Sequence, residues 1–179
     1  MAVVKKIIST LLVSAAAIGI GLALALYLPE QGAQQPAISD PAETADTAVH
    51  IGRLPGYENS PQNTTPEYFY YLFNAALNMG QDGSLPVMLE NTPGNECVMR
   101  VRYSLSDGRD LLVTPVIRPG EYLLYSFPSE LPQAGEYLVV VSIMVYHDGQ
   151  NPDTDEPFAS YTEQASLTVP KGAVLTANS

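Results

Sequence analysis

Residues 7–28 carry no charged side chain, and Lys5 and Lys6 lie immediately before them. As a helix, this 22-residue run would be roughly 33 Å long, enough to cross a hydrocarbon core of about 30 Å. We therefore predict that residues 1–28 form a signal anchor with a transmembrane helix at 7–28. The alternative is a signal peptide that is cleaved after Ala25, because 23–25 has the small-x-small pattern of a processing site. Cleavage would release a secreted protein.

The charges on either side of this run predict its orientation. Two lysines precede it, whereas Glu30, Asp40 and Glu43 follow it, and no Lys or Arg occurs between residue 28 and Arg53. Positive charge favours the cytoplasmic side of a membrane helix. We expect a single-pass protein of the cell membrane, with a cytoplasmic N-terminus and an extracytoplasmic C-terminal part.

The composition excludes some partners. The formal net charge is −11, with eight Lys and Arg against nineteen Asp and Glu. Nucleic acid is disfavoured because phosphate binding needs a basic surface. Cys97 is the only cysteine, so no intramolecular disulfide can form. We predict that it is a small buried hydrophobe rather than a reactive thiol.

The first part of the external region has little apolar periodicity. Residues 29–65 are predicted to be an extracytoplasmic spacer, with a candidate edge strand near 49–57 that ends in a Pro-Gly turn. Residues 66–79 are ambiguous. Phe69, Leu72, Phe73 and Ala76 recur at helical spacing, but the aromatic run at 68–73 has high strand propensity. Helix and strand both remain open there.

From residue 85 onward the pattern is that of β-structure. Apolar and mixed positions alternate along 97–103, an Asp-Gly pair at 107–108 is typical of a hairpin turn, and 138–146 is apolar on both faces. Val141 on that stretch is predicted to be buried. Short strands between frequent turns indicate an all-β antiparallel sandwich over 66–170, followed by a disordered tail at 171–179.

Several turn motifs occur in a recognisable order: Glu90-Asn91-Thr92-Pro93-Gly94-Asn95-Glu96-Cys97, Ser106-Asp107-Gly108, Ile117-Arg118-Pro119-Gly120 and Leu131-Pro132-Gln133-Ala134-Gly135-Glu136-Tyr137. Together with Leu54-Pro55-Gly56-Tyr57, they resemble the short single-pass surface proteins of Firmicutes that carry one immunoglobulin-like β-sandwich. The resemblance implies an immunoglobulin-like fold, no established activity and no site residues. Independently, Tyr137 stands two residues after a glycine at the start of a long strand, which is the position of a tyrosine corner.

The search for chemistry yields one candidate site. Between residues 147 and 156 the loop carries alternating oxygen ligands at Asn151, Asp153 and Asp155, the spacing that begins a calcium-binding loop. It departs from that loop at Glu156, where a glycine is needed, and lacks a bidentate Glu at the twelfth position. We therefore assign no metal, cofactor or catalytic residue, and keep these three residues as calcium candidates beside an acidic, solvated loop.

These observations favour a membrane-anchored module for binding or surface assembly, with a protein or carbohydrate partner outside the cell and no catalysis. The alternative is an extracytoplasmic calcium-dependent factor or hydrolase that uses the 147–156 loop with His147 and Asp148. No Ser lies in a nucleophile-elbow pattern, and no glycine-rich phosphate loop or paired zinc-ligand motif occurs.

Overall fold

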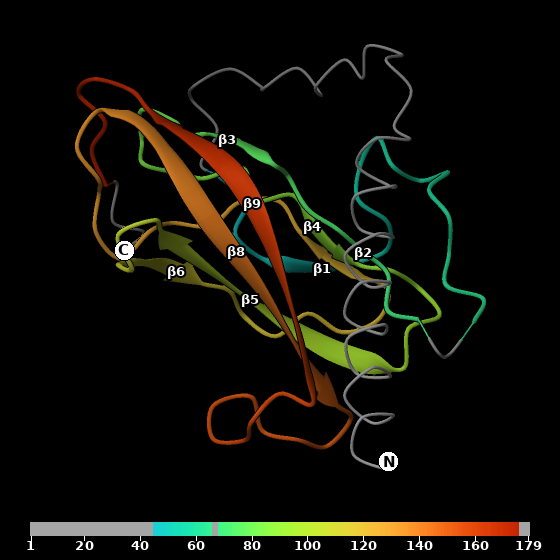
Figure 1. Ribbon diagram of the computed structural model, residues 1–179. Coiled ribbons are helices and arrows are strands. Elements are labelled where there is room, and N and C mark those ends of the chain that lie inside the picture. The colour runs from blue at the N-terminus through green and yellow to red at the C-terminus, as the bar shows by residue number, and fades with distance from the viewer. Residues whose placement is uncertain (1–44, 66–67, 176–179) are drawn as a thin grey trace, which may run out of the picture. The chain divides into compact units, whose positions relative to one another are not determined.

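The computed structural model describes residues 45–65 and 68–175. This part of the chain folds into two β-sheets that lie against each other (Figure 1). The sheets have four strands in the order β1-β7-β4-β2 and five in the order β3-β9-β8-β5-β6. The strands are β1 (Val49–Ile51), β2 (Tyr71–Leu72), β3 (Ala76–Asn78), β4 (Leu89–Asn91), β5 (Cys97–Leu105), β6 (Asp110–Val113), β7 (Glu121–Leu123), β8 (Gly135–His147) and β9 (Ala159–Val169). The prediction of an all-β, mostly antiparallel sandwich is confirmed at this level.

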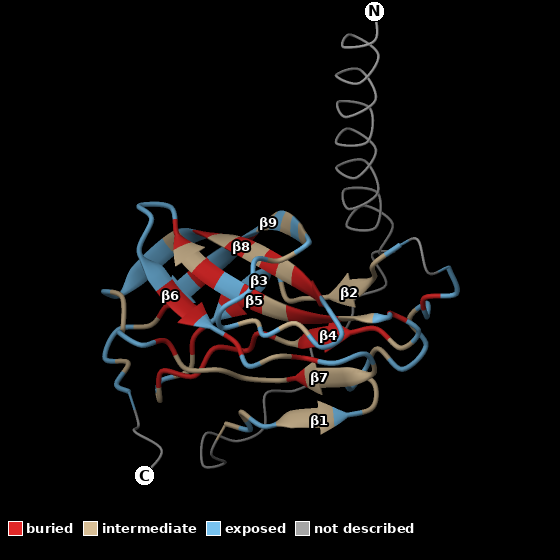
Figure 2. Cartoon of the chain, turned by 90° about the horizontal axis from the view of Figure 1, so that it is seen from below, coloured by how far each residue is buried: buried red, intermediate tan, exposed pale blue. Residues whose placement is uncertain are grey.

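The five-stranded sheet forms one wall of the core. β8 lies between β5 and β9 and pairs antiparallel with both. Buried and more exposed residues alternate along these strands (Figure 2). Met99, Val101 and Tyr103 of β5 are fully buried, and so is Val141 of β8, as the alternation predicted. The Asp-Gly turn is confirmed as well, with Gly108 at φ 89° between β5 and β6.

The four-stranded sheet contributes the opposite wall through Leu89 and Leu123, which have no exposed surface. Its other face is covered by residues 52–63, which we call the strap. Leu54 in the strap is only 1% exposed, so this segment, predicted as part of a spacer, packs against the domain. Residues of the predicted tail also contact the domain, because the backbone N–H of Val174 donates to the carbonyl of Gln81 (3.0 Å) and Ala173 packs on the core.

The ambiguous segment resolves as extended chain, and its helical alternative is wrong for the described residues from 68 on. β2 pairs with β4 in the first sheet, and β3 pairs with β9 in the second. The chain thus passes from one sheet to the other within a few residues. Phe69, Tyr71 and Phe73 alternate along it and pack, partly buried, against the core. The parallel β3–β9 pairing was not predicted.

The predicted transmembrane helix at 7–28 and the spacer up to residue 44 lie outside the described residues. Within the described part, none of the chain forms a helix with the length and apolarity needed to span a membrane.

Candidate functional site

The acidic loop joins β8 to β9 at one end of the five-stranded sheet. Its best-defined contact is an ion pair from β5: Nη1 of Arg100 lies 2.6 Å from Oδ1 of Asp153. The same guanidinium donates to the carbonyls of Thr114 (3.1 Å) and Pro152 (3.3 Å). One of the three calcium candidates therefore already faces a cation supplied by a neighbouring strand.

The other two calcium candidates support the loop's own backbone. Oδ1 of Asn151 accepts the N–H of Asp153 (3.1 Å), and Oδ2 of Asp155 accepts the N–H of Asn151 (2.8 Å). Side chains that accept backbone N–H groups two to four residues away are typical of turns. Within residues 45–65 and 68–175, no cluster of three or more His, Cys, Asp or Glu side chains is arranged to hold a metal ion. Calcium binding at Asn151, Asp153 and Asp155 stays a prediction.

The two histidines lie in different sheets. The ring of His147 stacks on Phe158 with centroids 3.9 Å apart, and its backbone N–H donates to Gln150 (2.7 Å). His50 on β1 stacks on Tyr122, and its Nε2 lies 2.8 Å from Oδ2 of Asp46. This close contact with His50 is the main cause that holds the pKa of Asp46 below its usual value. The structure therefore does not bring the two imidazoles together.

A buried ion pair that the sequence analysis missed joins the strap to the first sheet. Glu90 of β4 has no exposed surface, and its Oε1 lies 2.6 Å from Nε of Arg53. Its second oxygen accepts the N–H of Leu54 (2.7 Å). The guanidinium also donates to the carbonyl of Ser60 (3.0 Å). Both charges are used to hold the strap, which gives the pair a structural role.

Three asparagines form a second buried polar group between the strap and β4. Asn95 donates to Asn91 (2.6 Å), and Asn63 of the strap donates to Asn95 (2.8 Å). Asn91 itself donates to the carbonyls of Cys97 and Ile117, both at 2.9 Å. Each amide therefore has partners, as buried polar groups require. This asparagine network fixes backbone positions and presents no group to a ligand.

Cys97 was predicted to be buried, and the structure shows that it is only partly buried. It begins β5 and packs against the edge of the core. Burial, with a smaller effect from Glu96, raises the pKa of its thiol. A raised pKa lowers the thiolate fraction, which is the reverse of what a nucleophilic cysteine needs.

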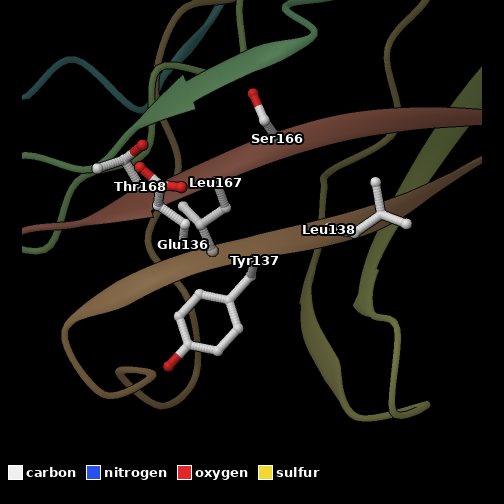
Figure 3. A pocket seen from close by; sticks show the side chains of 6 residues that line it. All are labelled: Glu136, Tyr137, Leu138, Ser166, Leu167 and Thr168. Carbon is white, nitrogen blue, oxygen red and sulfur yellow. The ribbon is translucent and has the colours of Figure 1, made fainter.

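Tyr137 makes the contact expected of a tyrosine corner. Its hydroxyl donates to the backbone carbonyl of Gln133, four residues upstream, at 2.7 Å. Near it, β8 and β9 carry a shallow surface depression, shown in Figure 3. Tyr137 lies on the opposite side of β8 from Leu138, so the lining side chains diverge instead of converging on a bound molecule. The depression is lined by Glu136, Tyr137, Leu138, Ser166, Leu167 and Thr168.

An aromatic cluster lies where the chain crosses between the sheets, beside β9. It consists of Phe69, Tyr71, Phe73 and Tyr161, all partly buried. Phe69 and Tyr161 stack with centroids 6.1 Å apart. The hydroxyl of Tyr71 donates to Glu163 of β9 (2.8 Å), and burial, reinforced by that carboxylate, raises the pKa of Tyr71.

Comparison with known proteins does not add a family: no family model, no curated protein and no solved structure matches this chain.

Proposed function

We propose that the protein is a membrane-anchored, extracytoplasmic β-sandwich module that acts in binding or surface assembly and not in catalysis. The proposal includes the finer assignments made from the sequence. These are an N-terminal helix at 7–28 as the anchor, an immunoglobulin-like form of the two-sheet fold, and a resemblance to single-pass Firmicutes surface proteins. The hydroxyl bond of Tyr137 to Gln133 supports the immunoglobulin-like assignment, because that contact is typical of such sandwiches.

One observation supports a binding role over a catalytic one. The buried polar groups of the described domain are engaged with its own backbone, as in the Arg53–Glu90 pair and the asparagine network. Asp153, one of the three calcium candidates in the loop of the alternative function, is paired with Arg100. These groups serve the architecture of a stable scaffold, whose surface is then free to meet a partner.

The membrane location is tested by charge insertion. Ile18→Lys with Leu22→Lys should release the full chain from the membrane fraction, because each charge at a helix centre costs about 2.5–3.5 kcal/mol on insertion scales. The matched control is Gln81→Lys with Ser106→Lys, which adds the same charge at two exposed positions of the domain. Membrane association that survives the first double substitution would contradict the anchor. Release of both variants would show that the added charge causes release from the membrane wherever it is placed, and not only within residues 7–28.

The orientation and the binding role need a second experiment. Protease added to intact cells should digest the C-terminal domain while a cytoplasmic marker protein stays intact. In permeabilised cells, the same protease should digest both. Crosslinking of the full chain in its own envelope should then capture a protein or glycan. Recovery of the chain in the cytoplasm, or of an uncrosslinked monomer alone, would contradict the proposal.

A further inference from the structure

Among the described residues 45–65 and 68–175, part of β9 has no partner strand on one side. β9 pairs with β8 along its whole length on one side, but on the other side β3 pairs only with residues 166–168. The N–H of Ser166 donates to Ala75, so alternate residues from 160 to 168 direct their backbone groups away from β8. In the described part of the chain, nothing hydrogen-bonds the outward backbone groups of Ser160, Thr162 and Gln164. We call residues 159–165 the β9 edge.

The β9 edge carries few of the features that keep sheet edges apart. Such edges are usually blocked by Lys, by Pro or by inward-pointing charges, and Glu163 is the single charged residue between 159 and 165. Here the outer-face side chains are Ser160, Thr162 and Gln164, all exposed and neutral. This matters because the chain as a whole has a net charge of −11, and two copies repel each other over most of their surface.

One pairing register uses this edge fully. In an antiparallel pair with its two-fold axis at Thr162, the two copies of Thr162 lie opposite each other, and Ser160 lies opposite Gln164 of the second copy. All three outward positions then exchange bonds, for about six interchain hydrogen bonds. Sliding the pair by two residues towards the C-terminus would run into Ser166, which β3 already occupies. Centring the pair on Glu163 would place two carboxylates face to face, which is unfavourable.

The inner face of the same register is also complementary. Glu163 points inward, where a charge can protect a sheet edge, but its carboxylate already accepts the hydrogen bond of the Tyr71 hydroxyl (2.8 Å). With the axis at Thr162, each Glu163 faces the phenol Tyr161 of the other copy rather than a second carboxylate. The inward side chains of the added strand would also cover the partly exposed aromatic cluster beside the edge.

We propose that the β9 edge binds a second copy of this chain by antiparallel β9–β9 pairing about Thr162, which joins two five-stranded sheets into one. This inference rests on the proposed role in binding or assembly and names a partner for it. The contact is a form of strand addition, in which backbone hydrogen bonds supply the affinity and the side-chain pattern supplies the register.

The test is disulfide crosslinking in the full chain in its membrane, with Cys97→Ala to remove the native thiol. Thr162→Cys should form a covalent dimer on mild oxidation, because its Cα atoms would be about 5.5 Å apart, within disulfide reach. The matched control is Thr168→Cys on the same face of the same strand, whose copies would lie roughly 40 Å apart. We expect at least about tenfold more dimer from Thr162→Cys than from this control.

The register is tested by mixing two variants. Gln164→Cys alone should not dimerise, since its two copies would be about 14 Å apart, but co-expressed with Ser160→Cys it should give a heterodimer. Thr162→Pro should abolish that heterodimer without loss of the β8 ladder, because its N–H points away from β8. Thr162→Val, which keeps the N–H, should leave the heterodimer intact. If circular dichroism shows that the Pro variant is unfolded, Thr162→Lys replaces it.

Hydrogen exchange of the peptide spanning 159–165 separates the remaining outcomes. Dimerisation predicts slow exchange that becomes fast in Thr162→Lys. If Thr162→Cys links no better than Thr168→Cys and exchange is fast, the edge is unoccupied and the inference is wrong. If no homodimer forms but exchange is slow, another strand fills the edge, from residues 29–44 or from a different protein, and the inference is equally wrong. Membrane fractionation, read on the same samples, reports on the proposed function separately.

Discussion

Removal of the Arg53 guanidinium should destabilise the domain strongly. Arg53→Met keeps most of the side-chain length but leaves the Glu90 carboxylate, which has no exposed surface, with the N–H of Leu54 as its remaining bond. Breaking a buried ion pair by removing one partner costs about 3–5 kcal/mol. The bonds from the guanidinium to the carbonyls of Tyr57 and Ser60 are lost at the same time.

The effect can be read as a shift in melting temperature. For a domain of this size, 1 kcal/mol corresponds to about 3–6 °C, so a loss of about 3–5 kcal/mol in Arg53→Met should lower the midpoint by roughly 9–30 °C. The chain has no Trp, so unfolding of the full chain in detergent is followed by circular dichroism. The matched control is Arg109→Met. It removes the same charge from a pair with Asp107 whose side chains are 66% and 52% exposed, and it should hardly move the midpoint.

A second substitution identifies the cause. Glu90→Gln removes the buried charge but keeps an oxygen for the N–H of Leu54, so the double variant Arg53→Met with Glu90→Gln should be more stable than Arg53→Met alone. An Arg53→Met midpoint no lower than that of Arg109→Met would refute the reasoning. It would mean that the strap is not held by this ion pair.

Four further predictions concern the core, the tyrosines, the acidic loop and pH. Val141→Asp places an unpaired carboxylate in the core and should cost about 4 kcal/mol or more by urea unfolding; an unchanged midpoint would show that β8 is not central. Tyr137→Phe loses the hydrogen bond to Gln133 and should lower the free energy of unfolding by about 0.5–1.5 kcal/mol. Tyr103→Phe should be neutral or stabilising, because the buried hydroxyl of Tyr103 has no hydrogen-bond partner in the described part of the chain. Equal losses of stability in the two variants would contradict this prediction. Millimolar calcium should leave the wild-type melting temperature unchanged, and a rise that disappears in Asp153→Asn with Asp155→Asn would establish a calcium site. The lowered pKa of Asp46 adds stability that is present above its ordinary value of 3.8 and is lost as the pH falls through the lowered pKa. Asp46→Asn should therefore flatten the acid limb of a plot of midpoint against pH, and an identical limb would show that Asp46 does not contribute.

The long strands β5 and β8 were predictable because their information is local. Alternation along 97–103 and the apolar stretch at 138–146 reflect burial of one or both faces, and the Asp-Gly turn at 107–108 needs the positive φ that Gly108 adopts. The bond of Tyr137 was predictable for the same reason, since its acceptor is only four residues away. Each of these features depends on near neighbours in the chain.

The strap could not be predicted in this way. Leu54 and Arg53 lie in a segment without periodicity, and their partner Glu90 is far along the chain. An Arg and a Glu that are distant in sequence carry no local sign that they will be paired and buried. The aromatic segment at 68–73 was ambiguous for a related reason: its spacing fits a helix and a strand equally, and only contact with β4 and β9 makes the extended form the more favourable one.

The sequence alone therefore determined the class of the fold, the long strands, the hairpin turn and the apolar run at 7–28, because periodicity and turn chemistry act over a few residues. Tertiary structure alone decided that 52–63 covers a sheet, that β3 joins β9 in parallel and that Asp153 meets Arg100. It also decided that β3 begins at Ala76, opposite Ser166, and leaves the β9 edge without a partner in the described chain. These are contacts between distant segments, and their free energy appears only when the two sheets are packed together.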